Sequence, residues 1–310
     1  MPGSFQHISV LPKETVDALA IKPNGVYVDG TLGGGGHSSL ILECLTGNAR
    51  LIGIDRDEDA LAAASIRCDS PRFVTARGNF HDMSEILHGM EISEVDGVLL
   101  DLGVSSYQLD TGERGFSYRL DGPLDMRMDN RAELNAHTII NTYSEKDIAH
   151  ILFTYGEERR SRRLANAICT ARAKSAINTT LELVDIIEKS SPRRKPGDSH
   201  PAMRTFMALR IAVNDELNPL AQALTNIVEI IKPAGRIAVI TFHSLEDRIV
   251  KTVFQNLTTP CTCPRDIPYC ACGKIPKLKK ITKKPIIPST EELSENSRAH
   301  SAKLRVAERV

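Results

Sequence analysis

The sequence predicts an α/β fold, a parallel sheet flanked by helices, with a helical domain inserted into it. Three observations support this fold class. Apolar segments of strand length alternate with helical segments over residues 1–101, and three of the strands end in aspartate. The alternation then stops, and a further apolar strand follows only at 236–242. Such alternation is typical of a parallel sheet that carries helices on both faces.

The first part of the chain contains four expected strands. The apolar runs that predict them cover residues 26–29, 50–55, 72–76 and 95–101. Helical patterns occupy residues 8–20, 38–45 and 59–67. The first strand runs directly into a glycine-rich loop, Gly30 to Gly36. Because glycine has no Cβ, such a loop lets the backbone come close to a ligand.

The alternation breaks at residue 103. Residues 103–131 show no clear period, and helical patterns follow over 134–189, 201–217 and 219–231. After the strand at 236–242 and a helix from Ser244, residues 301–308 alternate as a returning strand does. We therefore expect two domains: a discontinuous α/β domain of residues 1–112 and 214–310, and an inserted helical domain of residues 113–213.

Three acids at strand ends, Asp29, Asp55 and Asp101, mark the expected site. Open α/β sheets bind ligands at the carboxyl ends of their strands, where a carboxylate such as Asp55 accepts hydrogen bonds from ribose hydroxyls. For each acid taken alone, a helix N-cap is the alternative role. Grouped around one glycine-rich loop, the three acids favour a nucleotide-like cofactor.

The glycine-rich loop matches neither common phosphate-binding pattern. The dinucleotide pattern Gly-x-Gly-x-x-Gly needs glycine where Ser38 stands, and a P-loop needs a lysine that this loop lacks. An acid before the loop, Asp29, suits a cofactor with positive charge and no phosphate, which describes S-adenosylmethionine. A nicotinamide-dependent oxidoreductase is the alternative enzyme class, and Ser38 argues against it.

Several stretches of the sequence form long and unusual motifs. They are Asp29–Ser38, Ile54–Asp57, Leu100–Asp110, Arg114–Ser117, Asp121–Met128, Tyr155–Arg159, Thr241–Lys251 and Ser301–Arg309. In order along nearly the whole chain, they closely resemble the ribosomal RNA small subunit methyltransferase H family, also called MraW. The resemblance implies an S-adenosylmethionine-dependent methyltransferase (Rossmann-like) sheet with an inserted helical domain. It also implies N4-methylation of a cytidine in the decoding (P-site) region of 16S rRNA.

The resemblance further implies a set of cofactor contacts: Gly35, Gly36, His37, Asp55, Phe80, Asp101 and Gln108. Asp101 is also the expected catalytic residue. The lone pair of cytosine N4 is delocalised into the ring, and an acceptor that binds the amino hydrogens favours its attack on the methyl carbon. Whether Asp101 acts as a base or only orients the amine stays open.

RNA contacts are expected from the inserted domain. Phe116 and Arg127 are candidates to contact an unstacked target base, with simple packing of the loop as the alternative. Phosphate contacts are expected from Arg159, Arg160, Arg163 and Arg194, for which a solvated helix face is the alternative.

The formal net charge of zero conceals an asymmetry. Residues 1–148 carry an excess of Asp and Glu, and residues 149–310 carry an equal excess of Lys and Arg. A polyanionic partner is therefore not excluded, and the resemblance implies 16S rRNA within the small ribosomal subunit. A non-catalytic RNA-binding or ribosome-assembly protein is the alternative function, against which the acids at the strand ends argue.

Neither an apolar run of about 20 residues nor a signal-peptide pattern is found, which predicts a cytoplasmic protein without a membrane partner. The sequence leaves monomer and homodimer equally open.

The seven cysteines fall into two groups. Cys44, Cys68 and Cys169 are scattered, and we expect them to be packed as small apolar residues. Cys261, Cys263, Cys270 and Cys272 form two Cys-x-Cys pairs, which suit a tetrahedral Zn²⁺ site. Structural thiols and a disulfide are the alternatives, because the spacing is tighter than the usual Cys-x₂-Cys.

Overall fold

The structure is a computed structural model that describes residues 9–192, 197–264, 269 and 271–310. It divides into two compact units, Met1–Gly103 with Leu217–Val310, and Val104–Glu216. The arginine at 194 and the cysteine at 270 lie outside the described residues. No helix in the described ranges is long and apolar enough to cross a membrane.

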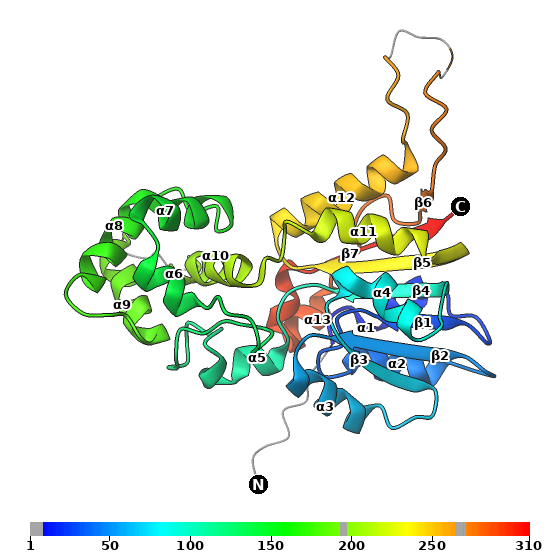
Figure 1. The fold of residues 1–310 in the computed structure, drawn as a ribbon, viewed down its shortest axis with the longest axis horizontal. Coiled ribbons are helices and arrows are strands. Elements are labelled where there is room, and N and C mark those ends of the chain that lie inside the picture. Colours follow the sequence, from blue (N-terminus) through cyan, green and yellow to red (C-terminus); the bar gives the residue numbers. More distant parts are fainter. Residues whose placement is uncertain (1–8, 193–196, 265–268, 270) are drawn as a thin grey trace. The chain divides into compact units, whose positions relative to one another are not determined.

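The first unit is built on a seven-stranded sheet in the order β3-β2-β1-β4-β5-β7-β6 (Figure 1). The strands are β1 (Val26–Asp29), β2 (Arg50–Asp55), β3 (Phe73–Arg77), β4 (Val95–Asp101), β5 (Ile231–Thr241), β6 (Leu278–Lys280) and β7 (Lys303–Arg309). β1 to β5 are parallel, whereas β7 runs antiparallel to β5 and to β6. The expected parallel sheet is confirmed, and so is the returning C-terminal strand.

Strand register brings the three acids to one edge of this sheet. Asp29 is paired with Gly53 on β2 and with Leu99 on β4. Asp55 and Asp101 therefore each lie two positions further along a neighbouring parallel strand. The carboxyl ends of β1, β2 and β4 meet, as expected for the ligand-binding edge of an open sheet.

Helices cover both faces of the sheet (Figure 1). They are α1 (Pro12–Leu19), α2 (Gly36–Cys44), α3 (Glu58–Arg67), η1 (Phe80–Asp82), α4 (Met83–Gly89), α11 (Leu220–Glu229), α12 (Ser244–Thr258), α13 (Thr290–Glu295) and η3 (Ser297–Ser301). Successive strand residues point to opposite faces, so Tyr27 and Val28 enter two different cores. Burial of both faces explains why the strands are apolar throughout instead of alternating.

Two parts of the first unit differ from the sequence expectation. β5 begins at Ile231 and includes the Lys232–Gly235 segment, which its Pro and Gly predict to be a turn before the strand. β6 forms within residues 258–290, for which no regular structure is predicted, and α13 begins at Thr290, the last of these residues. β6 is only three residues long and is held by pairing with β7, so no local pattern marks it.

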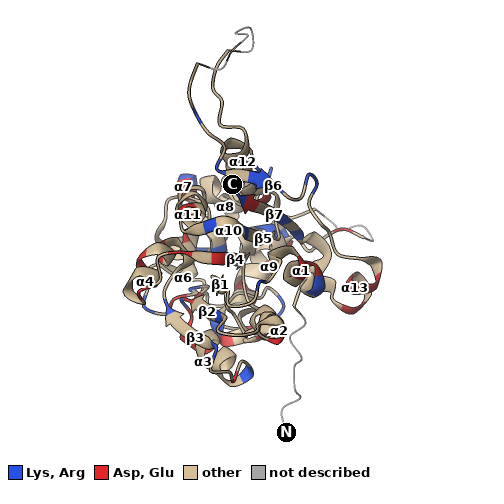
Figure 2. Cartoon of the chain, turned by 90° about the vertical axis from the view of Figure 1, so that its right-hand side faces the viewer, with Lys and Arg blue, Asp and Glu red and all other residues tan. Residues whose placement is uncertain are grey.

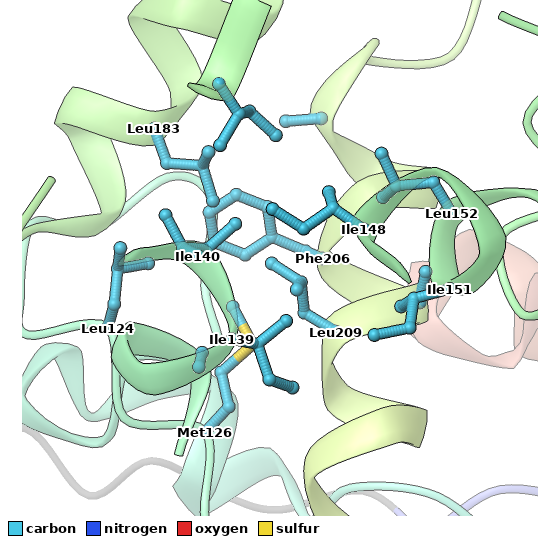
Figure 3. Close-up of a cluster of buried hydrophobic side chains, with 14 of the residues drawn as sticks. Leu124, Met126, Ile139, Ile140, Ile148, Ile151, Leu152, Leu183, Phe206 and Leu209 are labelled. Carbon is cyan, nitrogen blue, oxygen red and sulfur yellow. The ribbon is translucent and has the colours of Figure 1, made fainter. Parts of the chain in front are cut away.

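The second unit is helical. It comprises α5 (Ser106–Asp110), η2 (Gly112–Arg114), α6 (Ala136–Thr142), α7 (Glu145–Thr154), α8 (Ser161–Arg172), α9 (Thr180–Ser190) and α10 (Ala202–Asn214). Figure 3 shows its core, in which Ile140, Ile148 and Phe206 meet from three helices. The irregular loop before α6 contributes Leu124 and Met126.

This unit begins at Val104, whereas the sequence analysis places the start of the inserted domain at residue 113. Val104 and Leu109 pack against the helical core. The intervening residues carry no helical period, so the sequence alone gives no reason to assign them to it.

Candidate active site

The glycine-rich loop between β1 and α2 is organised around Asp29, which is 1% exposed. One carboxylate oxygen accepts the backbone N–H of Thr31 at 3.2 Å, and the other accepts the Ser38 hydroxyl at 2.7 Å. Burial raises the pKa of Asp29, and the hydrogen bond from Ser38 opposes that rise. Both oxygens of this acid, which the sequence analysis expects to face a positively charged cofactor, are engaged inside the loop.

Asp55 fixes the next turn. One oxygen accepts the N–H of Gly33 at 2.8 Å, and the other accepts the N–H of Asp57 at 2.9 Å. Asp57, not Asp55, caps α3. A carboxylate oxygen has two acceptor sites, so Asp55 keeps the capacity to bind ribose hydroxyls while it holds the loop.

Two glycines of the loop are required for different reasons. Gly35 has a φ of +73°, and a Cβ there would lie 3.0 Å from Cys68 Sγ and 3.1 Å from Ala64 Cβ. Gly30 packs against different neighbours: a Cβ there would lie 2.6 Å from Leu100 and 3.2 Å from Phe80. Glycine therefore lets the loop lie directly against α3 and against the start of η1.

Gly34 differs from these two glycines. An added Cβ meets no atom within 4 Å, and its φ is not in the left-handed range. Neither packing nor backbone conformation therefore explains glycine at this position. The loop backbone at Gly34 is therefore open to close approach by a ligand.

Asp101 at the end of β4 differs from Asp29 and Asp55 because one of its carboxylate oxygens accepts no hydrogen bond from the described residues. Its backbone N–H donates to Thr31 Oγ1 at 2.5 Å, which ties β4 to the loop. Its Oδ1 is buried and has no hydrogen-bond partner among the described residues. Burial raises the pKa of Asp101 to about 6; the nearby His37 lowers it, whereas Asp29 and Glu246 raise it further.

His37 in the first turn of α2 lies beside the other oxygen of Asp101. Its Nε2 lies 2.8 Å from the Val10 carbonyl oxygen, which can only accept, so Nε2 carries a hydrogen. Nδ1 lies 3.6 Å from Asp101 Oδ2, which is longer than a hydrogen bond. The interaction with Asp101 is therefore electrostatic, and it lowers the pKa of Asp101.

Phe80 and Gln108, the other expected cofactor contacts, lie in different units. Phe80 begins η1 and is partly buried against the core of the first unit. Gln108 belongs to α5 of the second unit, where it forms a capping box with Ser105. Its Oε1 accepts the Ser105 N–H at 3.2 Å.

The two residues expected to contact the base have structural partners. Phe116 is 5% exposed and belongs to the core of the helical unit, which favours the packing alternative. Arg127 binds Asp125 with two hydrogen bonds of 2.7 Å, and its third nitrogen donates to the carbonyls of Asn130 and Ala132. Both residues stabilise the loop that precedes α6.

The arginines expected to contact phosphate are on the surface. Arg159, Arg160, Arg162 and Arg163 surround the start of α8 and are all exposed. Within the part of the chain that the structure describes, no side-chain partner is seen for these four guanidinium groups. The expected contact at 194 falls outside that part.

Three of the four clustered cysteines meet: the sulfur atoms of Cys261, Cys263 and Cys272 lie within 4.8 Å of one another. The fourth, Cys270, falls outside the described residues. Cys68 is buried as expected, and its thiol donates to the Gly35 carbonyl at 3.5 Å. The expectation for Cys44 is wrong, because it ends α2 at the surface.

Thr31, Ser38 and Val10 hold the site, and sequence reasoning did not identify them as site residues. Ser38 draws attention only as a departure from the dinucleotide pattern, but its hydroxyl is what engages Asp29. Thr31 lies in the loop and carries a hydroxyl, which is a weak signal. Val10 contributes a backbone carbonyl, for which the sequence contains no signal.

Comparisons with known proteins identify the family of this chain. The chain matches the MraW methylase family over residues 4–310. Ribosomal RNA small subunit methyltransferase H of Lachnospira eligens is 52% identical over 309 residues, which cover 99% of this chain and 98% of that protein. The protein of that name from Brevibacillus brevis is 53% identical over 311 residues, covering 99% of both chains.

Among solved structures, an rRNA methylase from Streptococcus thermophilus aligns over 96% of this chain and 93% of that one, with a TM-score of 0.40 and 9% identity. A likeness this weak adds nothing to the argument, whereas the sequence matches extend over the acids, the glycine-rich loop and the helical unit alike. The chain belongs to the MraW methylase family.

Proposed function

We propose that this protein transfers a methyl group from S-adenosylmethionine to N4 of a cytidine in the decoding (P-site) region of 16S rRNA, within the small ribosomal subunit. The observation that carries the proposal is the buried, unpartnered Oδ1 of Asp101 at the carboxyl edge of the sheet, beside the glycine-rich loop. The names of the curated relatives support the substrate, since they describe ribosomal RNA small subunit methyltransferases.

The residues at the sheet edge fit the proposed cofactor. Asp55 would accept hydrogen bonds from the ribose hydroxyls, and Gly34 to Gly36 would let the backbone come close. Phe80 offers an aromatic ring near the start of the loop. His37 joins this set by resemblance to the family, and the same resemblance implies Gln108 as a cofactor contact. The bound cofactor supplies a methyl group made electrophilic by the positive charge on its sulfur.

Asp101 is the proposed catalytic residue. Its free Oδ1 accepts a hydrogen bond from the exocyclic amine, which orients the nitrogen lone pair toward the methyl carbon. His37 lies 3.6 Å from the opposite oxygen, and its electrostatic attraction favours this orientation of the carboxyl group. The proton that the nitrogen loses can pass to Asp101, whose raised pKa of about 6 makes it a better acceptor than an ordinary aspartate.

A pair of loop substitutions tests cofactor binding. Gly34→Ala places a methyl group in open space, so we expect unchanged thermal stability and roughly tenfold weaker S-adenosylmethionine binding by calorimetry. Gly35→Ala is the matched comparison, because its strained φ and close neighbours predict a loss of about 1–3 kcal/mol of stability. Unchanged cofactor affinity in Gly34→Ala would remove the loop from the proposed site.

Two basic surfaces are proposed to bind the RNA backbone. One is the arginine cluster at the start of α8. The other surrounds a shallow pocket lined by Lys251, Phe254, Lys280, Thr282, Lys283 and Arg305. Its residues come from α12, β6, β7 and the segment after β6, where Figure 2 shows Lys and Arg in blue. Cations that converge without a matching number of acids suit phosphate groups.

The decisive experiment offers S-adenosylmethionine with a labelled methyl group to naked 16S rRNA, small subunits and intact ribosomes. We expect label in RNA from at least one of these, recovered as N4-methylcytidine after nuclease digestion and mass spectrometry. Label in another nucleoside would overturn the assigned acceptor. Binding of RNA without transfer to any of the three would support the non-catalytic alternative, and binding of NADH in place of S-adenosylmethionine would support an oxidoreductase.

A further inference from the structure

The segment that joins α12 to β6 has no regular structure of its own. Between Thr258 and Leu278 the described residues contain no helix or strand, and the two legs run side by side away from those elements (Figure 1). Two large side chains are almost fully exposed, Tyr269 at 83% and Ile275 at 79%. A segment with no core of its own gains little from burial to offset the entropy lost on ordering it, so a cross-link is the usual remedy.

Three thiols occupy the place where such a cross-link is needed. The sulfur atoms of Cys261, Cys263 and Cys272 lie within 4.8 Å of one another, although Cys272 comes from the opposite leg. A tetrahedral Zn²⁺ with Zn–S bonds of about 2.3 Å holds its sulfurs roughly 3.8 Å apart. Closing the cluster around an ion therefore needs a movement of only about 1 Å.

The cluster fits a metal better than a disulfide. A disulfide joins two sulfurs at about 2.05 Å and would leave the third thiol of the group unused. In addition, the Ala271 N–H donates to Cys263 Sγ at 3.3 Å. This hydrogen bond joins the two legs at the residue before Cys272, so the backbone already brings Cys263 to the opposite leg.

We propose that Cys261, Cys263 and Cys272 bind a structural Zn²⁺ ion that clamps the two legs of this segment together. Each thiol gives its proton to solvent as it becomes a ligand, and no oxidation is involved. The fourth cysteine of the motif, Cys270, lies outside the described residues. The metal site is independent of methyl transfer, so failure of the zinc proposal would not affect the proposed function.

The test is the metal content of the full-length protein, purified under reducing conditions without added metal. We expect about one zinc per chain. Cys261→Ser, Cys263→Ser and Cys272→Ser should each lower the zinc content at least about tenfold. Cys44→Ser removes an exposed thiol outside the segment and should retain the metal. Replacement by Co²⁺ should give the intense visible absorption of tetrahedral thiolate coordination.

Limited proteolysis provides the structural readout. Trypsin should cleave after Lys274 and Lys277 slowly in the zinc-bound protein, and at least about tenfold faster after chelation or in Cys272→Ser. Cofactor affinity should stay unchanged in these variants, which excludes general unfolding. The proposal is overturned by wild-type protein that contains no zinc and gives no cobalt absorption. It is equally overturned by zinc that survives all three substitutions, or by a disulfide detected among these cysteines under non-reducing conditions.

Discussion

Asp101→Asn should reduce the rate of methyl transfer by about 10²-fold or more, because it replaces the proposed acceptor of the amine hydrogens with a neutral amide. The substitution preserves shape, so Thr31 should still accept the backbone N–H of residue 101. The loss should appear in kcat under saturating S-adenosylmethionine. Single-turnover kinetics with the best of the three RNA substrates measures it directly.

Asp55→Asn is the matched comparison, since it makes the same chemical change at the end of β2, which β1 separates from β4. Asp55 holds the glycine-rich loop through the Gly33 N–H, and its proposed role is to bind the cofactor ribose and not the reacting amine. We therefore expect a higher KM for S-adenosylmethionine with kcat changed by only a few-fold. Full activity in Asp101→Asn, with unchanged cofactor affinity, would show that Asp101 is not the catalytic residue.

The stability of Asp101→Asn gives an independent check of its folding. The pKa of Asp101 is about 6 in the folded protein against 3.8 without the protein environment, so ionisation disfavours the folded state. The wild-type protein should lose up to roughly 2–3 kcal/mol of unfolding free energy as the pH rises from about 4 through 6. The amide introduced by the substitution does not titrate, so the variant should gain stability relative to the wild type over that range. Thermal unfolding curves at several pH values measure the difference.

Charge reversal at the start of α8 should weaken RNA binding while it leaves the fold intact. Arg160→Glu combined with Arg163→Glu removes two exposed cations from one face of the helix. We expect roughly 10- to 100-fold weaker binding of small subunits at moderate salt, and a shallower dependence of affinity on salt. Filter binding across a salt series measures both quantities.

The helix dipole allows an effect of this double variant on RNA binding to be distinguished from an effect on stability. Positive side chains at a helix N-terminus are unfavourable, and glutamate there is favourable. The double variant should therefore be at least as stable as the wild type, so weaker binding cannot be attributed to unfolding. Lys13→Glu with Arg50→Glu is the matched control, because both residues are exposed and lie in the other unit. An equal loss of binding in the control would indicate a general effect of charge.

Sequence periodicity was sufficient to predict β1, β2 and β4, because strands buried on both faces are continuously apolar. The acids that end these strands could be predicted to meet, since parallel strands present their carboxyl ends at one edge. Which of these acids keeps a carboxylate oxygen without a hydrogen-bond partner could not be predicted. Asp29 is occupied by the Ser38 hydroxyl, whereas Asp101 retains a free oxygen, and that distinction depends on the path of a glycine-rich loop.

The sequence also failed to predict the structural roles of Phe116 and Arg127, because these roles depend on how the chain folds around them. Phe116 lies in a polar, aperiodic stretch, yet helices that follow it in the sequence enclose it. Arg127 forms its ion pair with Asp125 because the loop turns back on itself at Met126, which has a φ of 61°. Neither the left-handed conformation of Met126 nor the burial of Phe116 is marked by a local sequence pattern.

The discontinuity of the first unit has a consequence for the order in which the protein folds during synthesis. β4 pairs with β5 only across the whole of residues 104–216, and β5 pairs with β7 at the very end of the chain. The helical unit is contiguous in the sequence, so all of it is synthesised before β5 and it can fold before the sheet is complete. The sheet edge that carries Asp101 is complete only after β5 and β7 have joined the sheet. The capacity for methyl transfer should therefore arise late in the folding of the nascent chain.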